Sequence, residues 1–246
     1  MFDITRFGIN QSTVTTAVSE YLKIETENIF KPYKPVRRVY NFVDLELFRR
    51  KPSTAHRANF ARPDQPIYIH VSNFRPVKRI LDIIQIFARV RKSVDAVLLM
   101  VGEGPLLREA RELAGKLGIS KHVKFLGKQE DIVTLLSSSD VLLFPSETES
   151  FGLAPLEAMA CEMPVIASES GGIPEVVDAS CGFLAPVGDT ENMAKHAIEL
   201  GLSADLRAKM GKAGRLIAES KFHSDIIIPQ YEAIYQEAMT LAGKCA

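Results

Sequence analysis

Short apolar runs alternate along the chain with longer stretches in which apolar residues recur at helical spacing. Continuous apolar runs are typical of strands buried on both faces, as in a parallel sheet. Strands are predicted over residues 67–71, 96–101, 123–126, 141–144 and 164–167. Helices are predicted between them, over residues 79–91, 105–117, 131–138 and 153–161. This regular order predicts an α/β fold with a Rossmann-like, doubly wound parallel sheet.

The two ends of the chain depart from this alternation. A strand over residues 13–18 and a helix over 20–30 are predicted near the start, with Ser19 as the helix N-cap. Residues 31–66 contain five prolines and many charges, which indicates a connecting segment. The remaining predicted helices cover residues 190–200, 204–219 and 224–242.

The last of these helices has an apolar side that requires a covering surface. Its members are Ile228, Tyr231, Ile234, Tyr235 and Ala238. Because the chain also starts with a lone strand and helix, we expect it to be part of a larger protein. A partner or a second copy of the chain, giving a homo-oligomer, would also cover such a face.

Composition and charge narrow the class of protein. The chain has 246 residues, of which 46% are hydrophobic and 24% are charged, as in ordinary globular domains. The 30 Lys and Arg residues balance 30 Asp and Glu residues, which speaks against general nucleic-acid binding and against attraction to an anionic membrane. No apolar run is long enough to span a bilayer, and the N-terminus lacks the pattern of a secretory signal.

The cysteines point to a reducing compartment. Cys161, Cys181 and Cys245 stand at spacings that match no metal-ligand pattern, and the five histidines are scattered. We therefore expect reduced thiols, no metal site and a cytoplasmic location.

The strongest chemical signal follows the strand predicted to end at Phe144. The segment from Glu149 to Glu157 reads ESFGLAPLE and has Gly152 at the junction of a loop and a helix. Open α/β sheets bind ligands at this carboxyl edge, and the free amides of a helix start favour an anion. Glu157 suits the hydroxyl pair of a ribose. By residue type alone, the segment is equally consistent with a capped helix that carries two solvated acids.

A second signal, SNFRPVKR, follows the strand predicted over residues 67–71. It places Arg75, Lys78 and Arg79 at the carboxyl edge, where guanidinium and ammonium groups suit a diphosphate. The alternative is a basic helix start on the surface, although helix N-termini favour acidic residues.

Three glycine turns and a histidine carry weaker signals. Gly102-Glu103-Gly104-Pro105 lacks the third glycine of a dinucleotide fingerprint, which speaks against an NAD-dependent oxidoreductase. The turn GGIPE at 171–175 either brings backbone close to a ligand or fits a crowded space. The turn GKQ at 127–129 could offer main-chain groups to a base edge. His70, inside a predicted buried strand, is interpreted as a core residue.

Together these motifs resemble those of the retaining glycosyltransferases of family 4, which have the GT-B fold. The resemblance rests on the two spaced glutamates with SFGL between them, on GEGP, GGIPE and FLG, and on a linker-like RVYNFVD at 38–44, where Phe42 replaces the family's glycine. It implies that residues 1–40 are a remnant of the N-terminal domain and the linker. Residues 41–222 would be the nucleotide-sugar-binding domain, and 223–246 a helix that crosses back toward the N-terminal domain.

Within family 4, the segments SNFRPVKR, NFVD, FLGKQ and SFGLAPLEAMAC resemble the branch that transfers N-acetylglucosamine from UDP-GlcNAc to L-malate in bacillithiol biosynthesis. The resemblance implies retaining hexosyl transfer without a metal or a cofactor, the UDP-sugar being a substrate. Alternatives are a family 4 enzyme with another sugar or acceptor, and a UDP-sugar-binding module without activity. Because the acceptor-holding domain is largely missing, we expect the chain alone to bind the donor without turning it over.

The resemblance also assigns roles to residues. Lys78 matches the lysine that holds the donor diphosphate, and Arg75 is expected to supply a guanidinium because Asn73 stands where other members have arginine. Glu149 would face the transferred sugar, and Glu157 would hold the ribose. The predicted catalytic residues are Arg75, Lys78 and Glu149, and the predicted donor-binding residues are Ser72, Asn73, Lys128, Gln129, Ser150, Phe151, Gly152, Leu153 and Glu157.

Overall fold

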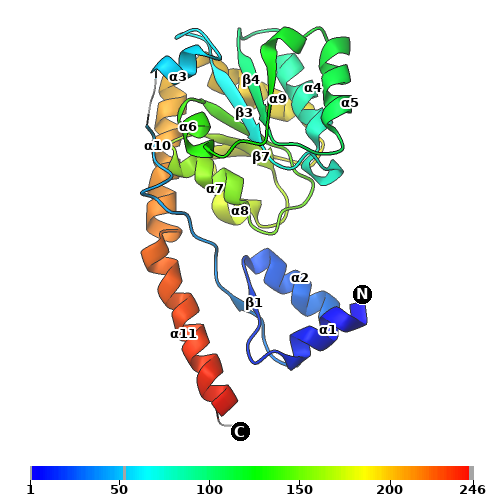
Figure 1. Ribbon diagram of the computed structural model, residues 1–246, viewed down its shortest axis with the longest axis vertical. Helices are drawn as coiled ribbons and strands as arrows, with labels where there is room; N and C mark the ends of the chain where they lie inside the picture. The colour runs from blue at the N-terminus through cyan, green and yellow to red at the C-terminus, as the bar shows by residue number, and fades with distance from the viewer. Residues whose placement is uncertain (1, 52–53, 244–246) are drawn as a thin grey trace.

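The computed structural model describes residues 2–51 and 54–243, and its largest element is a parallel sheet of six strands (Figure 1). The strand order is β5-β4-β3-β6-β7-β8. The first strand of this sheet, β3, is therefore central, and the later strands are added outward, first on one side and then on the other. The strands are β3 Ile67–Val71, β4 Val97–Val101, β5 Val123–Gly127, β6 Val141–Phe144, β7 Val165–Ser168 and β8 Gly182–Ala185. The doubly wound α/β prediction is confirmed.

Alternate strand residues face two separate hydrophobic layers. Tyr68 lies in the layer with α4, α5 and α9, while Ile67 and Ile69 lie in the layer with α6, α7 and α10 (Figure 1). The helices of the domain are α4 Ile80–Val90, α5 Leu107–Lys116, α6 Ile132–Ser137, α7 Leu153–Ala160, α8 Ile173–Val176, α9 Thr190–Leu202 and α10 Ala204–Lys221. Because both faces of each central strand are covered, the strands read as continuous apolar runs.

The N-terminal segment forms a small separate unit beside the sheet domain (Figure 1). It contains α1 Phe2–Gln11, β1 Thr16–Ala17, α2 Glu20–Phe30 and β2 Arg37–Arg38, and the two strands pair in parallel. Ser19 caps α2 as predicted, because its hydroxyl oxygen accepts a hydrogen bond from the amide of Leu22 at 3.0 Å. The predicted strand over 13–18 shrinks to two residues, since its one partner, β2, is equally short.

Four elements were not predicted from the pattern. Helix α1 has no buried residue, and large apolar side chains such as Phe7 are exposed, so the need to cover a core does not predict it. Strand β8 starts at a glycine and is only half-buried at its centre, at the edge of the sheet. Within the expected connecting segment, β2 and a short helix, α3 Thr54–Ala58, interrupt the irregular chain.

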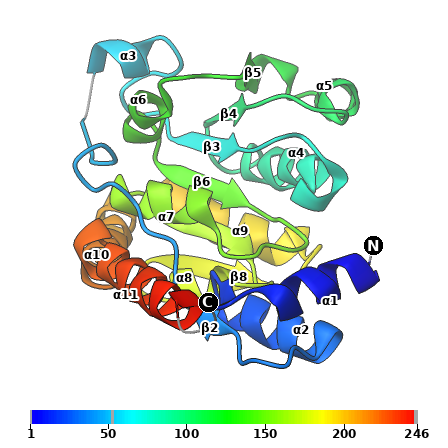
Figure 2. The ribbon, with the colours of Figure 1, turned by 60° about the horizontal axis from the view of Figure 1, so that its bottom comes forward.

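The C-terminal helix, α11 Ser224–Gly243, runs back along the N-terminal unit (Figures 1 and 2). The side chains of Arg37 and Glu237 form an ion pair, and the hydroxyl of Tyr231 reaches the carbonyl oxygen of Val39 at 3.5 Å. The predicted apolar side is therefore partly covered. Tyr235 remains 66% exposed, so self-association through this face stays a prediction. No described helix is long and apolar enough to cross a membrane.

Candidate functional site

The loops that follow β3, β4, β5 and β6 meet at the carboxyl edge of the sheet and enclose two adjoining cavities. Val71, Ser72 and Asn73 line both cavities, so the two cavities share a wall at the end of β3 and the loop that follows it. The first, of about 370 Å³, is also lined by Val18, Asn41, Lys78, Phe144, Glu149, Ser150, Phe151, Gly152, Leu153 and Ala154. The second, of about 430 Å³, is also lined by Val101, Gly102, Glu103, Lys128, Gln129, Ile132 and Glu157.

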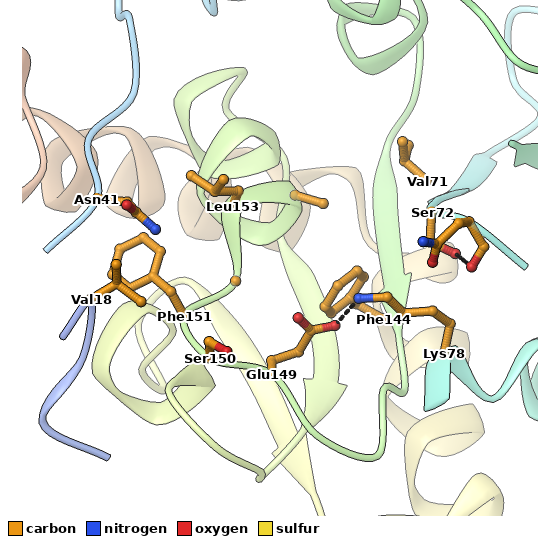
Figure 3. A pocket seen from close by; sticks show the side chains of 13 residues that line it. Val18, Asn41, Val71, Ser72, Lys78, Phe144, Glu149, Ser150, Phe151 and Leu153 are labelled. Carbon is orange, nitrogen blue, oxygen red and sulfur yellow. Dashed lines mark hydrogen bonds and ion pairs between the residues drawn. The ribbon is translucent and has the colours of Figure 1, made fainter. Parts of the chain in front are cut away.

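An ion pair between Lys78 and Glu149 lies in the wall of the first cavity (Figure 3). Lys78 ends a short 3-10 helix, Pro76–Lys78, and its side chain is 19% exposed, against 14% for Glu149. The backbone holds the two loops together, because the amide of Glu147 donates to the carbonyl of Val77 at 2.8 Å. The lysine ammonium also lies 5.4 Å from the centre of the Phe144 ring.

The turn at Gly171 and Gly172 supports the loop that carries Glu149. The amide of Gly172 donates to the carbonyl oxygen of Glu149 at 2.9 Å. Gly171 has φ +59°, and a Cβ atom on Gly172 would come within 2.5 Å of the carbonyl oxygen of Ser150. Of the two interpretations of this turn, the structure supports the crowded space.

Helix α7 begins at the floor of the first cavity. Gly152, its N-cap residue, has φ +110° and no side chain with which to cap the helix. A Cβ atom there would come within 2.6 Å of the Cδ1 atom of Ile173. The first amides of the helix thus remain available to an anionic ligand, whose charge the helix dipole favours.

Glu157 lies one turn into α7 and lines the second cavity. Burial raises the pKa of its carboxyl group to about 7. Within residues 2–51 and 54–243, no side chain forms an ion pair with it. Together with the 14% exposure of Glu149, this makes the alternative of two solvated acids wrong. A half-buried carboxyl group facing a cavity is suited to bind hydroxyl groups of a ligand.

The predicted site residues divide between the cavities, with one exception. Ser72 and Asn73 line both, and Lys128, Gln129 and Glu157 line the second. The first takes Lys78, Glu149, Ser150, Phe151, Gly152 and Leu153. Arg75 is exposed and lines neither, so its role stays a prediction without geometric support.

Two contributors to the first cavity come from outside the sheet domain and were not predicted as site residues. Val18 and Asn41 lie near Phe151, and Asn41 belongs to the linker-like NFVD segment, which was the available signal (Figure 3). The hydroxyl of Ser19 donates to the carbonyl oxygen of Ser150 at 2.5 Å. The N-terminal unit is therefore attached directly to the loop that forms the cavity.

Glu175 provides a second attachment of the N-terminal unit. Its carboxylate accepts hydrogen bonds from the amides of Glu20 at 2.8 Å and Tyr21 at 2.9 Å. These are the first amides of α2, where a negative charge is favourable. The turn GGIPE thus supports the Glu149 loop through its glycines and caps α2 through its glutamate.

Comparison with known proteins gives consistent matches over most of the chain. The family model described as glycosyl transferases group 1 matches residues 53–217. The chain is 43% identical over 239 residues to N-acetyl-alpha-D-glucosaminyl L-malate synthase from Bacillus anthracis, covering 96% of this chain and 63% of that protein. It is 34% identical over 218 residues to D-inositol 3-phosphate glycosyltransferase from Saccharomonospora viridis, covering 83% of this chain and 50% of that protein.

A solved structure with a similar fold is sucrose-phosphate synthase from Thermosynechococcus elongatus. It matches with a TM-score of 0.87 at 25% identity, covering 98% of this chain and 62% of that one. The expected GT-B type of fold is confirmed. The chain spans between half and two thirds of the length of these relatives.

Proposed function

The chain belongs to the glycosyl transferases group 1 family, and on that basis we propose that it holds the donor site of an enzyme that transfers N-acetylglucosamine from UDP-GlcNAc to L-malate. The 43% identity to the Bacillus anthracis malate synthase supports this donor and acceptor. The proposal includes retention of configuration and transfer without a metal. It also includes a cytoplasmic location, which the free thiols of the two buried cysteines support.

The arrangement that carries the proposal is the pair of adjoining cavities. The first offers Lys78 and the start of α7, which suit the two phosphates of a nucleoside diphosphate. The second offers Glu157 for the ribose, and Lys128 and Gln129 for the base. A single elongated ligand with a phosphate-rich middle and a nucleoside end fits this order of groups.

The mechanism that we propose is electrostatic. As the bond between the sugar and the donor diphosphate breaks, negative charge grows on the phosphate oxygen that leaves. Lys78 and the first amides of α7 are positioned to neutralise that charge, and fixed donors of this kind contribute roughly 10²–10³ in rate each. Glu149 forms an ion pair with Lys78 in the structure, so we assign it to orienting the sugar rather than to nucleophilic attack.

The acceptor half of the reaction needs more protein than the described cavities supply. The chain covers 63% of the malate synthase, and the N-terminal unit contributes only Val18 to the cavity walls, with Asn41 added by the linker-like segment. We therefore propose that the chain alone binds the donor without transferring the sugar. Mass spectrometry of a mixture with UDP-GlcNAc and L-malate tests this, and a GlcNAc-malate product would contradict it.

Donor identity is tested by calorimetric titration of the chain with UDP-GlcNAc, UDP-glucose and GDP-mannose. We expect UDP-GlcNAc to bind more tightly than GDP-mannose, because the second cavity would be matched to uracil. Preference for GDP-mannose would assign the chain to another donor within the same family. Similar affinity for UDP-GlcNAc and UDP-glucose would leave the nucleotide assignment intact and contradict the choice of sugar.

A further inference from the structure

His70 is a fully buried histidine that contacts Ser72, a residue in the walls of both cavities. It lies on β3, and both of its ring nitrogens have partners. Nδ1 lies 2.8 Å from the carbonyl oxygen of Leu143 on β6, and Nε2 lies 2.7 Å from the hydroxyl oxygen of Ser72. The prediction that His70 is a core residue is correct, because its side chain is fully buried. His70 nevertheless contacts the candidate site, because its partner Ser72 lines both cavities.

These partners fix the protonation of the ring. Burial lowers the pKa of His70 to about 4, so the ring is neutral at physiological pH and carries one N–H. A carbonyl oxygen only accepts, so the hydrogen resides on Nδ1 and points to Leu143. Nε2 is therefore an acceptor, and its bond with Ser72 requires the serine to donate.

The hydroxyl hydrogen of Ser72 is consequently directed into the protein. The carbonyl oxygen of Asn73 lies 3.0 Å from the same hydroxyl and competes for the hydrogen, but the imidazole nitrogen at 2.7 Å is the closer acceptor. What Ser72 then offers the cavities is its oxygen lone pairs. A ligand hydroxyl or N–H can bind there, whereas a phosphate oxygen is repelled.

We propose that His70 is a positioning residue that fixes Ser72 as a hydrogen-bond acceptor at the junction of the cavities, where it recognises a hydroxyl or amide N–H of the donor. The inference rests on the proposed donor-binding function. In this arrangement Lys78 attracts the phosphates of the donor, and Ser72 accepts a hydrogen bond from a neighbouring hydroxyl or N–H group.

The first test requires no ligand. Nitrogen NMR of the histidine rings in the unliganded chain reports which nitrogen carries the hydrogen, and Ser72→Ala serves to identify the coupled signal. We expect His70 to be neutral with hydrogen on Nδ1, and its Nε2 signal to shift in Ser72→Ala. Hydrogen on Nε2, a charged ring, or an unshifted signal would overturn the inference whether or not the chain binds nucleotides.

The second test uses matched variants in calorimetric titrations with UDP-GlcNAc. Asn at position 70 can retain the bond to Leu143 but does not reach Ser72, whereas the longer Gln places an acceptor near the Nε2 position. We expect Ser72→Ala and His70→Asn each to weaken binding about 3- to 10-fold, as for one neutral hydrogen bond. His70→Gln should remain within about 2-fold of the unmodified chain.

The double variant His70→Asn/Ser72→Ala distinguishes positioning from a structural role. If His70 acts through Ser72, the double variant binds as Ser72→Ala does, because the second change removes nothing further. Additive losses, or normal affinity in Ser72→Ala, would overturn the inference. No binding by the unmodified chain would instead contradict the proposed function, while the NMR result would still decide the hydrogen position.

Discussion

Lys78 and Glu149 form an ion pair across 71 residues of sequence, and both side chains are mostly buried in the cavity that we assign to the donor phosphates. The lysine is thus neutralised by the protein when the site is empty. A diphosphate that enters the cavity must compete with the Glu149 carboxylate for the same ammonium group. Binding would then release Glu149 toward the sugar.

This competition predicts the effect of Glu149→Gln on nucleotide affinity. The amide is neutral, so it neither holds Lys78 as strongly nor repels phosphate oxygens. We expect UDP to bind about 3- to 10-fold more tightly, which corresponds to a net gain of roughly 1 kcal/mol. Uridine, which lacks phosphates, is the matched control and should bind unchanged. Weaker or equal UDP binding in calorimetric titration would contradict the competition.

Replacing Lys78 tests its catalytic role. Lys78→Ala removes the positive charge that meets the leaving phosphate, and we expect mainly a loss of turnover, of roughly 10²–10³-fold. Because we propose that the chain alone does not transfer the sugar, turnover is measured with this chain joined to the acceptor-binding part of a malate synthase. A large loss of donor affinity with unchanged turnover would show that Lys78 only binds the ground state.

Glu157 should make the stability of the chain depend on pH. Burial raises its pKa from the ordinary value of 4.5 to about 7, so the folded chain holds this proton more tightly than the unfolded chain. The resulting stability is complete below pH 4.5 and is lost as the pH rises through about 7. Urea unfolding should therefore show a fall of up to about 3 kcal/mol across this window. Glu157→Gln should lack this fall and be the more stable protein at pH 8.

The glycine turn predicts a steric effect. Gly172→Ala places a Cβ atom against the carbonyl oxygen of Ser150, so the loop that carries Glu149 must move. We expect destabilisation of about 1–3 kcal/mol, as for overpacking, together with weaker UDP binding. Gly8→Ala is the control, because nothing lies within 4 Å of the added atom in α1. Equal melting temperatures for the two variants would contradict the crowded turn.

The contact of Glu175 with α2 predicts a local change in dynamics. Glu175→Gln weakens two charge-assisted hydrogen bonds to the amides of Glu20 and Tyr21. We expect those amides to exchange hydrogen about 5- to 30-fold faster, in line with a helix cap of about 1–2 kcal/mol. Exchange in β3 should be unaffected. Unchanged protection at the start of α2 would mean that Glu175 does not hold the N-terminal unit.

The inner strands β3, β4, β6 and β7 could be predicted because they are buried on both faces. β3 and β6 have the predicted bounds, and α2 begins after the cap that Ser19 suggested. Strand β8 and helix α1 lack such a signal, because one begins at a glycine on the sheet edge and the other has no buried residue.

The candidate site residues Lys78, Glu149 and Glu157 were predicted because charged side chains follow the ends of predicted strands in the sequence. The relationships within it could not be predicted, because they depend on loops that meet only in the folded chain. The bond between His70 and Ser72 and the capping of α2 by Glu175 are of this kind. Arg75 was chosen by charge and family resemblance, yet it lies outside both cavities.

The most direct test of the account is calorimetric titration of the chain with UDP, with ADP and NAD as controls and Glu157→Ala alongside. At pH 8, where Glu157 is mostly ionised, we predict selective binding of UDP, weakened in the variant by about 1.5–3 kcal/mol, as for hydrogen bonds to a charged group. Equal UDP affinity in Glu157→Ala, or tight binding of NAD by the folded chain, would contradict the donor site described here.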